Sequence, residues 1–216
     1  MKPQINIFRV AKDFAWENFA DKIWSRSESV SLTKYWSGQS APPERGATVR
    51  LLWTDINLLV RFDCAQHEPF VISQHPQTDV EAKNLWERDV CEIFIAPNPD
   101  APERYFEFEV APTGEWLDYA IVQLPERREV DTDYNAGIRT GAQIYENSFS
   151  VIFSIGWNAL GKKPSAGEQW LGNLFRCVGI GENRGYLAWQ PTRTRQPNFH
   201  VPQAFGRFSF REESLN

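Results

Sequence analysis

Short runs of alternating apolar and polar residues dominate this chain and restrict it to a fold built from β-strands. Phe106, Phe108 and Val110 alternate with Glu107 and Glu109, so an extended strand would place the two sets on opposite faces. Comparable runs, separated by turn-forming Gly, Pro, Asn and Asp, lie at 49–53, 58–62, 90–95, 116–122, 137–145, 149–155, 171–181, 186–190 and 205–210. Only 12–20 and 157–161 show a pattern typical of short helices.

These ten or so strands predict an all-β fold. Many short, evenly spaced strands joined by Gly and Pro turns favour an antiparallel two-sheet β-sandwich, immunoglobulin-like or jelly-roll-like, with one or two short helices. No Pro-, Gly- or Ser-rich linker and no internal repeat divides the sequence. We therefore expect residues 1–216 to form one domain, and this length is sufficient for a well-buried core.

Charge and hydropathy exclude several classes of partner. The net charge of −5 argues against nucleic acid, which requires a basic surface. No run of 18 apolar residues predicts a membrane span, and the first residues lack an apolar signal segment, which favours a cytoplasmic location. Cys64, Cys91 and Cys177 are odd in number and have no CxxC spacing, so we expect reduced, structural thiols.

The motifs of common enzymes and cofactor sites are missing from the sequence. It has no GxSxG nucleophile motif and no phosphate-binding P-loop. His67, His75 and His200 lack zinc-site spacing. We expect no cofactor. The Asp and Glu content would allow a structural calcium ion, but no loop spaced like an EF-hand places one.

Aromatic residues are unusually frequent, and one segment sets them beside carboxylates. Nine Trp, six Tyr and fifteen Phe make up 14% of the chain, which indicates that some rings serve a surface. Trp86 stands at the start of a predicted strand that carries Glu92. An indole can lie flat against a sugar ring while carboxylates bind the hydroxyls, so the segment favours saccharide recognition. Two carboxylates across a cleft could instead hydrolyse a glycoside.

The same segment resembles carbohydrate-binding module family 9, of DOMON-like fold. Residues 86–95 match the family's segment Trp-Glu-x-Asp-x-x-Glu-Ile-Phe-Ile. Further similarities, in the same order along the chain, extend the resemblance over about residues 45 to 210. The segments 171–176 and 197–200 are similar to a divergent, stand-alone bacterial branch. The resemblance implies a sugar held between two aromatic rings, at the positions of Trp86 and Phe199, with Glu92 binding hydroxyls.

The resemblance also shows departures. Where well-known binders have Arg and Asn after the Pro loop, this chain has Glu109 and Ala111, and Arg176 replaces a Gln. Compared with those binders, the positive and negative side chains at the site are thus partly exchanged in position.

We therefore expect non-catalytic binding of a mono- or oligosaccharide between Trp86 and Phe199. The hydroxyls would be bound by Glu92, Glu107 and Arg176, and the rim would be formed by Arg88, Glu109 and His200. Structural alternatives are a Trp86 that covers the core and a Glu92–Arg176 salt bridge. Functional alternatives are a glycoside hydrolase or lyase that uses Glu92, Glu107 and Glu109, and a ligand-free protein-interaction domain, in which Trp86 would be buried with no groove beside it.

Overall fold

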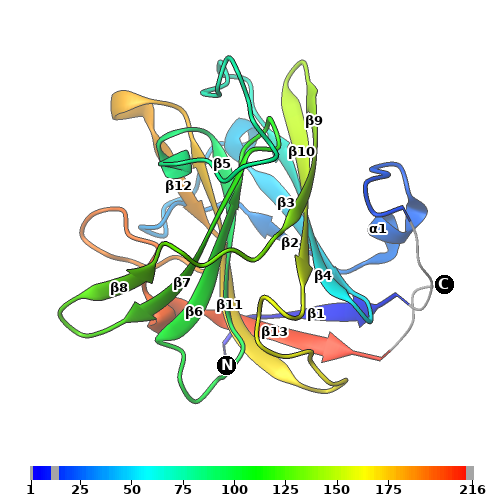
Figure 1. Ribbon diagram of the computed structural model, residues 1–216. Coiled ribbons are helices and arrows are strands. Elements are labelled where there is room, and N and C mark those ends of the chain that lie inside the picture. Colours follow the sequence, from blue (N-terminus) through cyan, green and yellow to red (C-terminus); the bar gives the residue numbers. More distant parts are fainter. Residues whose placement is uncertain (1, 11–14, 213–216) are drawn as a thin grey trace.

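The computed structural model describes residues 2–10 and 15–212, and nearly all of the regular secondary structure in them is β-strand (Figure 1). Thirteen strands are formed: β1 (Gln4–Arg9), β2 (Ser29–Leu32), β3 (Ala47–Trp53), β4 (Asn57–Ala65), β5 (Val90–Ala96), β6 (Arg104–Val110), β7 (Trp116–Gln123), β8 (Arg128–Asp131), β9 (Arg139–Tyr145), β10 (Ser148–Gly156), β11 (Gln169–Val178), β12 (Gly185–Ala188) and β13 (Gly206–Arg211). The remaining elements are the helix α1 (Lys22–Arg26) and the 3-10 turns η1 (Pro43–Arg45), η2 (Leu85–Glu87), η3 (Gly181–Asn183) and η4 (Pro202–Ala204).

The strands pair in one curled path, β8-β7-β6-β5-β11-β13-β1-β3-β4-β10-β9, with β12 added to β11 and β2 to β3. The path folds back on itself, so β5–β8, β11 and β12 face the layer of β1–β4, β9, β10 and β13 (Figure 1). The all-β sandwich is confirmed, with thirteen strands in place of about ten. Purely antiparallel pairing is wrong, because β1 runs parallel to both β13 and β3.

Strand β11 forms the corner where the path turns between the layers. Its first residues, 169–172, pair with β13, whereas 175–178 pair with β12. Gly172 lies at this turn, where a Cβ atom would stand 2.3 Å from Phe208 Cε2 and 2.4 Å from the Phe94 carbonyl oxygen. Only glycine allows the strands to approach so closely.

Apolar side chains cover both faces of the layer that contains β5, β6 and β11. One set, including Ile93, Phe108 and Leu174, packs between the two layers as the main core. The alternate set, including Phe94 and Phe175, forms a second cluster on the outer face, covered by residues from 186 to 205. Both faces are buried because the strand residues alternate between the two clusters.

The short helices differ from expectation. Residues 12–14 of the predicted segment 12–20 lie outside the described residues, and its remainder forms turns. The helix lies at α1, where Asp21 accepts a hydrogen bond from the Ile23 N–H at 2.9 Å. Residues 157–161 form turns, not a helix. No described helix has the length and apolar character needed to cross a membrane. All three cysteines are free and buried, as the sequence predicts.

Replacing Gly172 with alanine tests the corner. We expect Gly172→Ala to lower the free energy of unfolding by about 1–3 kcal/mol, because the new methyl group overlaps a backbone carbonyl that cannot turn aside. Gly141→Ala on β9 is the control, since its Cβ would meet Phe19 at an ordinary 3.5 Å. Urea denaturation of both variants measures the difference, and equal stabilities would contradict the steric argument.

Candidate functional site

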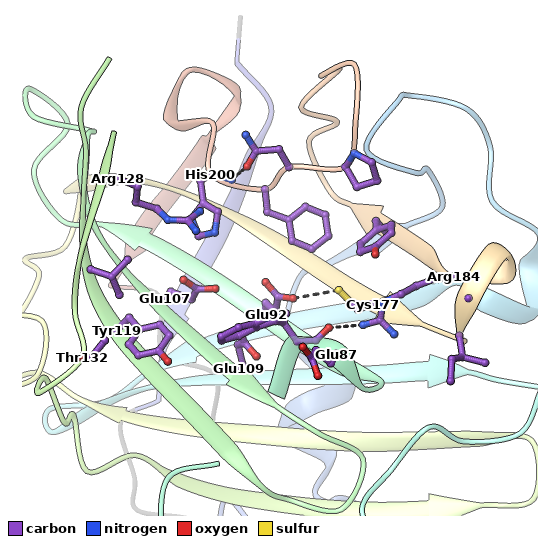
Figure 2. A pocket seen from close by; sticks show the side chains of 18 residues that line it. Glu87, Glu92, Glu107, Glu109, Tyr119, Arg128, Thr132, Cys177, Arg184 and His200 are labelled. Atoms are coloured by element: carbon purple, nitrogen blue, oxygen red, sulfur yellow. Dashed lines mark hydrogen bonds between the residues drawn. The ribbon is translucent and has the colours of Figure 1, made fainter. Parts of the chain in front are cut away.

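A cavity of about 810 Å³ opens on the outer face of β5, β6, β7 and β11 (Figure 2). Its walls are completed by β8, β12, the η2 turn, the start of η3 and the loop at 197–200. The lining residues are Trp86, Glu87, Glu92, Glu107, Glu109, Tyr119, Arg128, Val130, Thr132, Cys177, Ile180, Gly181, Arg184, Tyr186, Pro197, Asn198, Phe199 and His200. This volume is typical of a small-molecule site.

Three glutamates form an acidic cluster on the floor of the cavity. Glu92 of β5 is the direct cross-strand partner of Glu109 on β6, and Glu107 lies two residues earlier on the same face. Ligand oxygens of the three carboxylates lie within 4.8 Å of one another, and Figure 2 shows the side chains gathered together. Among the described residues no other group of three Asp, Glu, His or Cys side chains has such spacing.

Burial keeps this cluster protonated to an unusually high pH. It raises the pKa of Glu92 to about 8, with help from the charge of Glu107, and the pKa of Glu107 to about 7. The pKa of Glu109 is raised well above its usual value by burial and then by the charges of Glu92 and Glu107. Cys177 donates a hydrogen bond to Glu92 Oε1 at 3.3 Å. Both Glu109 oxygens are buried, and the only described group that hydrogen-bonds to this side chain is the neighbouring acid Glu107.

Trp86 stands at the mouth of the cavity, 41% exposed. Its neighbour Leu85 is fully buried in the outer cluster and anchors the η2 turn. Arg184 fixes the turn from the other side, because its guanidinium donates to the carbonyls of Trp86 and, at 2.9 Å, Arg88. These contacts therefore fix the indole at the mouth of the cavity, where it does not cover the core.

The second predicted ring, Phe199, also lines the cavity but is only 8% exposed. One of its faces is stacked on Phe175, with ring centroids 4.0 Å apart. The neighbouring His200 is hydrogen-bonded through Nδ1 to the Tyr105 hydroxyl at 2.9 Å. Burial lowers the pKa of His200 to about 3, so its imidazole is neutral.

Two predicted site residues do not line the cavity. Arg176 is fully buried and, like Leu174, projects to the face opposite the glutamates; it donates to the carbonyls of Arg45 (2.7 Å), Gly46 (3.0 Å) and Ala65 (2.8 Å). It therefore contacts neither the cavity nor Glu92, and the alternative of a Glu92–Arg176 salt bridge is wrong. Arg88 is engaged in an ion pair with Glu115 at 3.0 Å.

The structure adds lining residues that the sequence analysis did not select, chiefly Tyr119, Arg128, Arg184 and Tyr186. Tyr119 follows from alternation along β7, where it shares a face with Leu117. Arg128 and Tyr186 come from strands of only four residues, too short for a clear pattern. Arg184 ends the η3 turn, whose sequence shows nothing of its reach to Trp86.

The chemistry available to this arrangement is binding by contact. Aromatic rings offer flat apolar faces, and the glutamates offer hydrogen-bond acceptors at the floor. The same three carboxylates could contact one cation, since their oxygens surround a common point. The cavity thus suits a ligand with both apolar faces and polar edges.

Comparison with known proteins gives the family. The family described as "Carbohydrate family 9 binding domain-like" matches residues 18–213, so the chain belongs to it, as the sequence resemblance implies. No curated protein matches the chain.

Solved structures share the fold at low sequence identity. A Bacteroides uniformis protein that is a candidate for carbohydrate binding has a TM-score of 0.75 and 17% identity, with 97% of this chain and 100% of that chain covered. A family 9 carbohydrate binding module from Caldicellulosiruptor kristjanssonii, in complex with cellotriose, has a TM-score of 0.69 and 18% identity (99% and 96% covered). The glucose complex of a module from the same organism has 0.67 and 18% (98% of each).

The acidic cluster predicts a stability that falls as pH rises. Glu92 and Glu107 titrate at about 8 and 7 in the folded chain, against 4.5 for an ordinary glutamate. Between those values the folded protein binds more protons than the unfolded chain, so the free energy of unfolding decreases from about pH 5 to pH 8. We expect Glu109→Gln, which removes one buried acid, to stabilise the protein at pH 8.5 by about 1–3 kcal/mol and by less at pH 5.5.

Thermal unfolding at pH 5.5 and 8.5 measures this effect. Glu146→Gln, in the exposed turn after β9, is the matched control and should leave both transitions unchanged. A Glu109→Gln shift of equal size at the two pH values would contradict the electrostatic explanation.

Proposed function

We propose that this protein binds a mono- or oligosaccharide in the cavity and performs no chemistry on it. The observation that carries the proposal is that an exposed indole, Trp86, and three buried carboxylates line the same cavity. The sugar would lie against Trp86, with its hydroxyls toward Glu92, Glu107 and Glu109. Each hydrogen bond contributes about 0.5–1.5 kcal/mol, so several of them together with the apolar contact of the indole would hold a sugar that water otherwise solvates.

Family membership supports the same function. The family is one of carbohydrate-binding domains, and related modules of the same fold are complexed with cellotriose and glucose. Both of these ligands are neutral and present the flat C–H faces that an indole can cover. They are therefore the first ligands to test.

The arrangement of the acids supports binding without catalysis. A glycoside hydrolase places its two carboxyl groups on either side of the bond that breaks. Here Glu92 and Glu109 are cross-strand neighbours on one sheet face, and Glu107 projects from that same face. All three would approach a ligand from the same side, which supports a binding role over hydrolysis.

Exposure of the indole also favours a ligand site over a ligand-free interaction domain. That alternative requires Trp86 to be buried without a groove beside it. Instead the ring is 41% exposed at the mouth of the cavity. Ile180, 69% exposed, lines the same cavity from the β11–β12 connection.

Truncation of the indole tests the proposal. We expect Trp86→Ala to weaken binding of cellotriose or glucose at least about tenfold, because the indole is the most exposed aromatic ring of the cavity. Tyr145→Ala, an exposed aromatic on β9 that does not line the cavity, is the control and should bind as the unaltered protein does. Isothermal titration calorimetry gives both affinities.

Two results would count against the proposal. Absence of heat with every neutral and charged saccharide tested would refute binding in this cavity. Release of chromophore from aryl glycosides, lost in Glu92→Gln, would show catalysis in place of simple binding.

A further inference from the structure

We propose that the preferred ligand is an amino sugar, whose ammonium group binds between Glu92, Glu107 and Glu109. This inference rests on the proposed saccharide binding and names the class of saccharide. It follows from the number, spacing and unmet hydrogen bonding of the carboxylates, together with the aromatic walls of the cavity.

The geometry of the acidic cluster matches an ammonium group. A primary ammonium has three N–H donors and no acceptor. Its positive charge favours the ionised form of the three buried acids, and each ionised carboxylate is an acceptor. The chosen oxygens lie within 4.8 Å of one another, a separation that lets one nitrogen approach all three at about 2.8 Å. A neutral hydroxyl has one donor and could satisfy only one of these carboxylates.

Glu109 is the residue that most requires such a ligand. Its side chain is fully buried and lines the cavity, and the only described group that hydrogen-bonds to it is another acid, Glu107, so no basic or amide donor is paired with either oxygen. Buried polar groups in proteins are nearly always paired, because an unpaired one costs free energy. A donor brought by the ligand would supply the missing partner.

The two cations near the cluster do not replace the ligand. Arg184 is committed to carbonyl groups: Gly179 at 2.7 Å, Arg88 at 2.9 Å and Trp86. Arg128 lowers the pKa of Glu107, and Arg184 those of Glu92 and Glu109, but burial outweighs both effects. His200 is neutral and adds no charge.

The size and walls of the cavity favour a sugar ring over a bare metal ion. An ion such as Ca²⁺ would use only the floor, and it takes six to eight oxygen ligands. The cavity of about 810 Å³ extends well beyond the cluster and is walled by aromatic rings: Trp86, Tyr119, Tyr186 and Phe199. A pyranose with an amino group would use both the rings and the acids.

Three ligands that differ in a single substituent test the inference. The β-1,4 trimer of glucosamine, its N-acetylated form and cellotriose carry an ammonium, an acetamide and a hydroxyl, respectively, at the same ring position. By isothermal titration calorimetry with the full chain at pH 7, we expect the glucosamine trimer to bind at least tenfold more tightly than the other two. This comparison uses the unaltered protein and needs no variant to fold.

Substitution of Glu109 identifies the group responsible. We expect Glu109→Gln to weaken the glucosamine trimer at least tenfold and cellotriose by a clearly smaller factor, since the amide keeps the shape and can still hydrogen-bond a hydroxyl but cannot become an anion beside an ammonium. Glu146→Gln should leave all three affinities unchanged, because its side chain is exposed in the β9–β10 turn. Circular dichroism checks that each variant is folded.

The alternative outcomes are separable. Cellotriose binding as tightly as the glucosamine trimer, or more tightly, would overturn the inference and leave the proposed function standing. Failure of all three ligands would overturn both. Calcium chloride that binds to the unaltered protein, competes with the glucosamine trimer and no longer binds to Glu109→Gln would overturn the inference in favour of a metal site.

Discussion

The pleat of three neighbouring strands, β5, β6 and β11, governs both the core and the site. Successive side chains on each strand point to opposite faces, so Cys91 and Ile93 enter the main core while Glu92 and Phe94 face outward. Register then aligns Glu92 with Glu109. A slip of one residue would move carboxylates into the main core, so the burial of that core also fixes the composition of the cavity floor.

Buried titratable side chains lie on both faces of this sheet, and the two faces differ in how these side chains are hydrogen-bonded. On the core side, the Arg176 guanidinium donates to three carbonyls and to Gln66 Oε1, which ties the η1 region and the end of β4 to β11. On the cavity side, Glu109 hydrogen-bonds to no described group except another acid, Glu107. A buried polar group with nearly all its donors satisfied holds the structure together, whereas one without a matching donor at a cavity surface marks a place for a ligand.

The alternation of apolar and polar residues made most of the strands predictable from the sequence, and also the sheet face on which the glutamates of the site lie. The pattern around Phe106 and Phe108 gave the correct faces for Glu107 and Glu109 without any structure. Arg176 was misplaced because a resemblance at one position was preferred to the alternation of its own strand, in which Leu174 and Val178 already indicated the core face. The short strands β2 and β8 were missed because four residues carry too little pattern.

The aromatic wall residues Trp86 and Phe199 could be predicted only from the family resemblance, because their positions depend on contacts between segments distant in sequence. Trp86 is held by Arg184, 98 residues later, through a hydrogen bond to its carbonyl oxygen. Phe199 reaches the cavity because it stacks on Phe175 of β11. No local pattern encodes either contact.

These contacts divide the site into two parts with different physical characters. The acids project from central strands that are hydrogen-bonded on both sides, so their positions follow from the sheet. The aromatic surfaces at Trp86 and Phe199 come from connecting segments that are anchored by a few side-chain contacts and not by strand pairing. The acids proposed to select the ligand by its charge therefore lie in the rigid part of the site, where small displacements are costly. Apolar contact resides in the part that can change between relatives without disturbing the fold. One sheet can in this way keep its architecture while the charged side chains that point outward from β5 and β6 differ, which is the basis of the proposed preference for an amino sugar.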